Sequence, residues 1–198
     1  MSSTEILNVS SGFMFWLQLE LAYQHNLSDF IGMERAFDSE LIPTEQLKQS
    51  PIHSVKENDD LRVQLMETAL FKDKAHNAYT KLYEVAQSLI STGEELPKFN
   101  ANYENLSKSD VFFNIGVGFL NYLKLKNAEN EVHKEFRHFV NSGDTEQMFI
   151  KQKEWGEATT KAIDQYHALL DSAYTELGVK DQSYEFVSNK IKEWMATA

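Results

Sequence analysis

The sequence predicts an all-α protein, in the form of an elongated antiparallel four-helix bundle with an additional C-terminal helix. Apolar residues recur at intervals of three and four along long segments without proline, which is the spacing of one helix face. The 3 prolines of the 198-residue chain all fall in two stretches, 43–58 and 92–109. We therefore expect a single domain over 1–198, with helices at about 12–41, 59–91, 109–141, 144–177 and 182–196.

The first expected helix, 12–41, has a regular apolar seam with one polar member, Asn26. A buried amide at such a position fixes the register of helix packing at some cost in stability. Because Ser28 and Asp29 follow, a break between Asn26 and Gly32 is the alternative to the continuous helix that we expect. The seam consists of Trp16, Leu19, Tyr23, Asn26, Phe30, Met33 and Phe37.

The next two helices are expected at 59–91 and 109–141. Ser109 is suited to the N-cap of the second of them, and Gly143 is suited to the left-handed conformation that ends a helix. The seam of 59–91 also repeats at three and four residues, and it consists of Phe71, Ala75, Tyr79, Leu82, Ala86 and Leu89.

The last two helices are expected at 144–177 and 182–196. Asp144 is followed three residues later by Gln147, which is the spacing of a capping box, and Gly178 is placed to end the longer helix. The four long helices are each about 45 to 50 Å long at 1.5 Å per residue, as an up-and-down bundle requires.

The composition excludes several classes of function. The chain carries 19 Lys and Arg against 30 Asp and Glu, and this net charge of -11 repels the phosphates of nucleic acids and of anionic lipids. With 0 cysteines it has no thiol nucleophile, disulfide or thiolate metal site. No Lys or Arg precedes the apolar run 13–17, unlike in a signal peptide, and the run 111–125 is too short to span a bilayer. We expect a cytoplasmic protein with no nucleic-acid partner and no transmembrane segment.

An acidic residue three positions before a histidine is the one motif that resembles a metal site. Carboxylate-bridged di-metal bundles combine such pairs with lone carboxylates, for which Glu20 and Glu129 are candidates. Helix geometry, at about 100° per residue, directs most of the paired side chains away from the apolar seams. A di-metal enzyme with Glu20, Glu129, Glu135 and His138 as ligands is therefore only an alternative, and we expect no cofactor and no catalytic residue. The pairs are Asp73 and His76, Glu135 and His138, and Asp164 and His167.

The sequence Gly116-Val117-Gly118 needs a separate explanation, because glycine is unfavourable inside a helix. No strand precedes it, so it does not have the context of a phosphate-binding loop. Small residues at these positions let a neighbouring backbone or aromatic ring come close to the helix. We therefore expect a packing role for both glycines.

Aromatic residues, 13 Phe, 8 Tyr and 3 Trp, lead to the functional hypothesis. Around 13–23 and 111–125, apolar residues surround nearly the whole helix, so the C-terminal helix, a second subunit or a ligand must cover the excess. We expect a non-catalytic interaction or regulatory protein that self-associates as a homodimer. The alternative is a protein that binds an apolar small molecule or coats a hydrophobic granule. The expected face consists of Phe13, Trp16, Glu20, Tyr23, Asn26, Phe112, Gly116, Phe119 and Tyr122.

Glu20 is the most informative polar residue of this face. It follows Trp16 by four residues and precedes Tyr23 by three, so the three side chains share one side of the helix. A carboxylate among these rings is partly desolvated and requires a Lys, Arg or Tyr partner, unless it reaches solvent at the edge of the seam. The sequence leaves both arrangements open.

Overall fold

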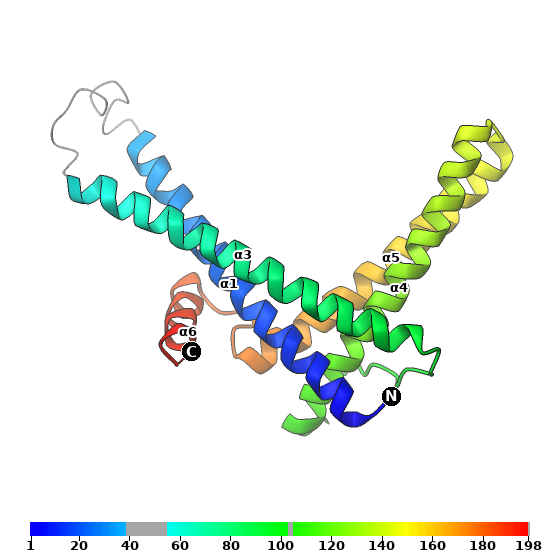
Figure 1. The fold of residues 1–198 in the computed structure, drawn as a ribbon, viewed down its shortest axis with the longest axis horizontal. Coiled ribbons are helices and arrows are strands. Elements are labelled where there is room, and N and C mark those ends of the chain that lie inside the picture. The colour runs from blue at the N-terminus through cyan, green and yellow to red at the C-terminus, as the bar shows by residue number, and fades with distance from the viewer. Residues whose placement is uncertain (39–54, 103–104, 198) are drawn as a thin grey trace. The chain divides into compact units, whose positions relative to one another are not determined.

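The computed structural model describes residues 1–38, 55–102 and 105–197, and this part of the chain is all-α, which confirms the expected class (Figure 1). Its helices are α1 (Ser3–Asp38), α3 (Val55–Ser91), α4 (Lys108–Ser142), α5 (Thr145–Leu177) and α6 (Tyr184–Thr197). Among the described residues, no helix is both long enough and apolar enough to cross a membrane.

The first helix begins at Ser3, well before the expected residue 12. A capping box explains the difference. The backbone N–H of Ser2 donates to the Glu5 carboxylate over 2.6 Å, and the backbone N–H of Glu5 donates to the Ser2 hydroxyl oxygen over 3.3 Å. Gly12 lies inside the helix, where a Cβ atom would stand 3.1 Å from Cδ1 of Leu82. The glycine therefore permits close packing of α1 on α3 and does not mark a helix start.

The continuity expected for the first helix is confirmed, because α1 runs unbroken from Asn26 through Gly32 to Asp38. The expected end at residue 41 lies outside the described residues, as do the side chains of Phe30, Met33 and Phe37.

The ends of α4 and α5 are determined by local capping interactions. The N-cap of α4 is Ser107 instead of the expected Ser109, and its hydroxyl oxygen accepts the backbone N–H of Asp110 over 3.2 Å. At the other end of α4, Gly143 adopts the expected left-handed conformation with φ of 75°. Asp144 caps α5 by accepting the backbone N–H of Gln147 over 3.1 Å, also as expected.

The chain divides into two compact units, each with its own core. Residues 1–14 and 81–182 form one of them, here called unit 1, and residues 15–80 and 183–198 form the other, unit 2. The expectation of one domain over 1–198 stays a prediction.

All four long helices contribute buried residues to unit 1, α1 and α3 through one end each. The antiparallel helices α4 and α5 are joined by a tight turn and lie side by side within this unit (Figure 1). The buried residues of this pair run from Val111 to Glu129 on α4 and from Ala162 to Ala173 on α5. The buried residues of the pair are therefore concentrated in one half of its length, and the four-helix bundle expected from the sequence stays a prediction.

The glycines of α4 are where two other segments come closest to it. A Cβ atom on Gly116 would lie 3.2 Å from the backbone nitrogen of Ser10 in α1, and one on Gly118 would lie 2.8 Å from the ring of Phe99. The hydroxyl of Ser10, itself buried, donates to the backbone carbonyl of Phe112. The packing role expected for these glycines is confirmed, and much of the apolar surface of 111–125 is covered from within unit 1.

Two asparagines of α4 hold the preceding segment, residues 92–102, against the helix. The buried amide of Asn114 accepts the backbone N–H of Asn100 and donates to the Asn100 carbonyl, both over 2.8 Å. About two turns further along α4, the amide of Asn121 donates to the carbonyl of Pro97 over 3.1 Å. The proline-containing connection is therefore anchored to α4 by hydrogen bonds on either side of Gly118.

Unit 2 is organised by the packing of α6 on α1 and α3. Ile191 of α6 is 1% exposed and forms a cluster with Ala22 of α1 and Phe71 of α3. The hydroxyl of Ser188, also buried, lies 3.2 Å from Nε2 of His25. Partly buried residues that pack against this cluster are Leu19, Leu21, Tyr23, Val187 and Trp194.

Candidate functional site: a groove between α1 and α3

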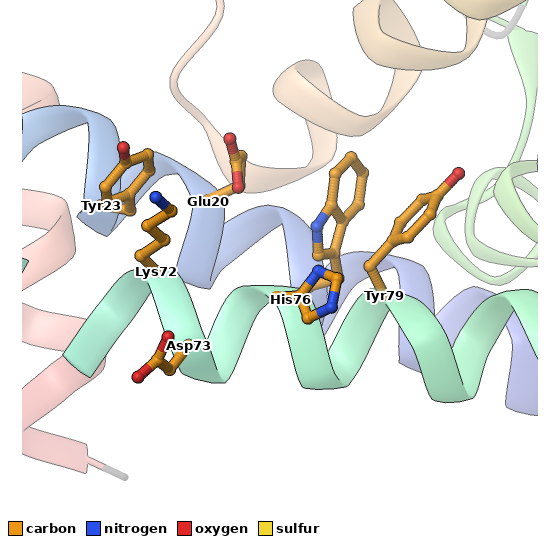
Figure 2. Close-up of a pocket in the computed structure, with 7 residues that line it drawn as sticks. Glu20, Tyr23, Lys72, Asp73, His76 and Tyr79 are labelled. Carbon is orange, nitrogen blue, oxygen red and sulfur yellow. The ribbon is translucent and has the colours of Figure 1, made fainter. Parts of the chain in front are cut away.

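A groove of about 510 Å³ runs between α1 and α3 within unit 2 (Figure 2). Its α1 side is formed by Trp16, Glu20 and Tyr23, three members of the face expected from the sequence. Its α3 side is formed by Lys72, Asp73, His76 and Tyr79. Aromatic and charged side chains therefore share one opening.

The register of the two antiparallel helices explains this composition. Trp16, Glu20 and Tyr23 follow an i, i+4, i+7 spacing, as do Lys72, His76 and Tyr79, so each set occupies one helix face. Trp16 lies beside Tyr79, and Tyr23 lies beside Lys72, with Glu20 between the two pairs (Figure 2). A step of seven residues forward along α1 thus matches a step of seven residues back along α3.

Two aromatic rings in contact form one end of the groove. The ring centroids of Trp16 and Tyr79 are 5.2 Å apart, and their planes are tilted by 55°. A pair with this geometry contributes about 0.5 to 1.5 kcal/mol beyond the area that it buries. Both residues are partly buried, so each ring also exposes part of its surface to the groove.

The charged side chains point in different directions. Glu20 and Lys72 point to the same side as Tyr23, whereas Asp73 points away from them (Figure 2). The carboxylate of Glu20 accepts a long hydrogen bond of 3.5 Å from Nε2 of Gln24, one turn further along α1. The ion pairs found among the described residues do not include Glu20 or Lys72. The hydrogen-bond partner of Glu20 is therefore the Gln24 amide, at the limit of hydrogen-bonding distance, and not one of the Lys, Arg or Tyr partners that the sequence suggested.

Tyr23 connects the groove to the core of unit 2. It lines the groove and also packs against the cluster of Ala22, Phe71 and Ile191. A molecule that contacts Tyr23 would therefore touch a residue that supports α6.

The structure divides the face expected from the sequence between the two units. Trp16, Glu20 and Tyr23 lie in unit 2, as does the half-buried Asn26. The remaining members lie in unit 1 and belong largely to its core. Phe13 and Phe119 are both 0% exposed, with ring centroids 5.1 Å apart.

The other unit 1 members of the expected face are also engaged. Gly116 is buried against α1, and Phe112 is half-buried. The ring of Tyr122 lies 4.9 Å from that of Tyr166, and burial raises the pKa of the Tyr122 hydroxyl. The apolar residues on several sides of α4 thus mainly pack against different segments of the same unit.

The candidate metal ligands are placed apart and have other partners. Glu129 is buried and forms an ion pair with Lys126. Glu135 pairs with Lys151 over 2.7 Å, and the ring of His138 packs on Phe139 at 5.4 Å. Glu20 lies in the other unit. In the part of the chain that the structure describes, no group of three His, Cys, Asp or Glu residues could hold a metal ion.

Sequence reasoning did not place the α3 side of the groove. It assigned Tyr79 to the buried seam and directed Asp73 and His76 outward. The latter two are indeed exposed, but they border the opening. The matching i, i+4, i+7 triplets on the two helices were the available signal, and they become informative only once the helix pair and its register are known.

Comparison with family models, curated proteins and solved structures gives no match.

Proposed function

We propose that this chain is a non-catalytic helical interaction protein that binds a partner protein through the groove between α1 and α3. One observation carries the proposal, namely an open groove of about 510 Å³ that combines three aromatic side chains with charged ones. Tryptophan and tyrosine are the residues that most often dominate binding energy at protein interfaces, where they pack inside a rim of polar groups.

The shape of the site supports a protein partner. Two antiparallel helices that each present an i, i+4, i+7 face can accept a third helix or an extended segment along the same axis. Trp16 and Tyr79 would form the apolar centre of such an interface, and Glu20, Lys72 and His76 its polar edge. The net charge of -11 favours a basic partner over a nucleic acid. The absence of cysteine is compatible with a reducing compartment, and we place the protein in the cytoplasm as part of the same proposal.

Site-directed crosslinking tests the groove directly. A photoreactive p-benzoylphenylalanine replaces His76, which borders the groove, or Asn77, which is exposed about 100° further round α3. We expect the variant at 76 to capture one discrete protein in the producing cells, and that protein, once identified and purified, to bind the unmodified chain. Equal capture from both positions, or no capture from 76, would contradict the proposal.

Self-association is the second form of interaction, and a specific surface favours it. Val63, Met66 and Leu70 of α3 are 49%, 66% and 52% exposed, and their i, i+3, i+7 spacing makes them one apolar stripe on unit 2. In a two-fold symmetric dimer each copy presents the same stripe, so apolar surface meets apolar surface. We expect light scattering to give twice the chain mass of 22.8 kDa. Met66→Glu should restore the single-chain mass, whereas Asn77→Glu, which adds the same charge to the same helix, should not.

A further inference from the structure

We infer that the Trp16 end of the groove binds the guanidinium group of an arginine side chain presented by the partner. This inference rests on the proposed function and specifies the chemistry of its site. A planar guanidinium can stack on an aromatic face while its N–H groups donate to a carboxylate, and the groove offers both kinds of surface within one helix turn.

The aromatic component comes from both helices. The Trp16 and Tyr79 rings lie 5.2 Å apart and are tilted by 55°, so they form two walls that meet at an angle. Indole is the ring that attracts cations most strongly, and guanidinium groups lie over such rings within about 6 Å of the centroid. Trp16 is therefore the expected stacking surface, with Tyr79 as the adjoining wall.

The carboxylate component is Glu20. It lies one turn from Trp16 on the same face of α1 and points toward the opening (Figure 2). Its hydrogen bond from Gln24 is 3.5 Å long, which leaves most of the acceptor capacity of its two oxygens for a ligand. A guanidinium placed over the Trp16 ring can direct two N–H groups at these oxygens, the arrangement that makes carboxylate and arginine pairs strong.

Lys72 sets the direction of binding. Its side chain lies beside Tyr23, on the far side of Glu20 from Tyr79 (Figure 2). The ammonium group repels a cation from the Tyr23 end, so the guanidinium is directed to the Trp16 end. Asp73 points away from this opening and does not contribute a second carboxylate (Figure 2). The site is therefore more selective than a merely acidic surface.

The test separates this site from the general attraction of an acidic chain for cations. Tetra-arginine amide is titrated into the ¹⁵N-labelled full-length protein, and the indole N–H signals of its 3 tryptophans are followed by NMR. The variant Trp16→Phe identifies the signal of Trp16. We expect this signal to move on titration, and tetra-lysine amide to bind more weakly because an ammonium group does not stack.

Two isosteric variants provide the matched comparison. Glu20→Gln and Glu95→Gln each remove one negative charge, and Glu95 is exposed in the segment 92–102 of unit 1. We expect Glu20→Gln to weaken tetra-arginine binding about tenfold and Glu95→Gln to leave it within about twofold, with the two thermal melting curves unchanged. Equal weakening by both variants, or an unmoved Trp16 signal, overturns the inference. If crosslinking from position 76 still captures its partner in that case, the arginine site alone fails; if capture also fails, the proposed function fails with it.

Discussion

Gly116 of α4 lies so close to α1 that a Cβ atom built on it would stand 3.2 Å from the backbone nitrogen of Ser10 and would also meet the Ile6 carbonyl oxygen. Backbone atoms inside a helix cannot move aside as a flexible side chain can. The first turns of α1 can therefore pack on α4 at this distance only because residue 116 has no side chain.

A pair of glycine variants tests this contact. Gly116→Ala should lower the free energy of unfolding by about 1 to 3 kcal/mol, because α1 must be displaced. Gly156→Ala is the control, since no atom lies within 4 Å of a Cβ at that position of α5. It should raise the stability by about 0.5 to 1 kcal/mol through the higher helix propensity of alanine. Denaturant unfolding measures both, and a stabilising Gly116→Ala would show that the helices are not in close contact.

Asn114 should hold residues 92–102 against α4. Asn114→Ala removes two hydrogen bonds of 2.8 Å to the backbone of Asn100 and should cost about 1 to 3 kcal/mol. Amide hydrogen exchange at Asn100 should accelerate more than exchange in the middle of α4. The control is Asn130→Ala, which changes an exposed residue of the same helix and should leave both measurements unchanged.

Glu129 should make the pairing of α4 and α5 sensitive to acid. Burial by itself raises the pKa of this carboxyl, but hydrogen bonds from Lys126 and Thr159, the latter over 2.9 Å, outweigh it and hold the pKa below the ordinary value of 4.5. The charged form is thus favoured by folding. Its stabilisation is fully present above pH 4.5 and is lost as the pH falls through the lower pKa of the folded state.

The variant Glu129→Gln tests that assignment. At pH 7 it should unfold more easily than the original chain by about 1 to 3 kcal/mol, since a hydrogen-bonded charge has been removed. The difference should shrink as the pH falls from 4.5 through the lower pKa of the folded state, where the original carboxyl also becomes neutral. Melting curves recorded between pH 3 and pH 7 would show this convergence, and a difference independent of pH would speak against the role of the charge.

Ile191 should anchor α6 to unit 2. Because this side chain is 1% exposed and packs with Ala22 and Phe71, Ile191→Ala should cost about 2 to 5 kcal/mol through lost burial and the cavity left behind. Exchange of α6 amides should become rapid while the amides of α4 and α5 stay protected. Lys192→Ala, at the exposed neighbouring position, should change neither. Rapid exchange throughout the chain would instead mean that the two units unfold together.

Much of the helical architecture was predictable because it depends on neighbours in the sequence. Gly143 ends α4 through its own left-handed backbone, and Asp144 caps α5 by bonding a backbone group three residues away. The early start of α1 also depends on a local signal, the capping box of Ser2 and Glu5. The start predicted at residue 12 did not use this signal and was therefore too late.

The candidate site was predictable only on one side. The sequence placed Trp16, Glu20 and Tyr23 on a common face, because the helical repeat requires it. It did not separate them from Phe13 and Phe119, which belong to the core of unit 1. Two residues on a single apolar stripe can have different packing neighbours along a long helix. The spacing of the stripe does not show at which residue these neighbours change.

The amino-acid sequence by itself determined that this protein is helical, where most helices begin and end, and which residues share a helix face. These properties follow from hydrogen bonds and spacings within a few residues. Only the tertiary structure decided that Gly116 meets Ser10, that Trp16 meets Tyr79, and that an aromatic face is shared between two units. Such pairings depend on the volumes and shapes of side chains far apart in the chain. They determine which aromatic rings are buried in the core and which line an open groove.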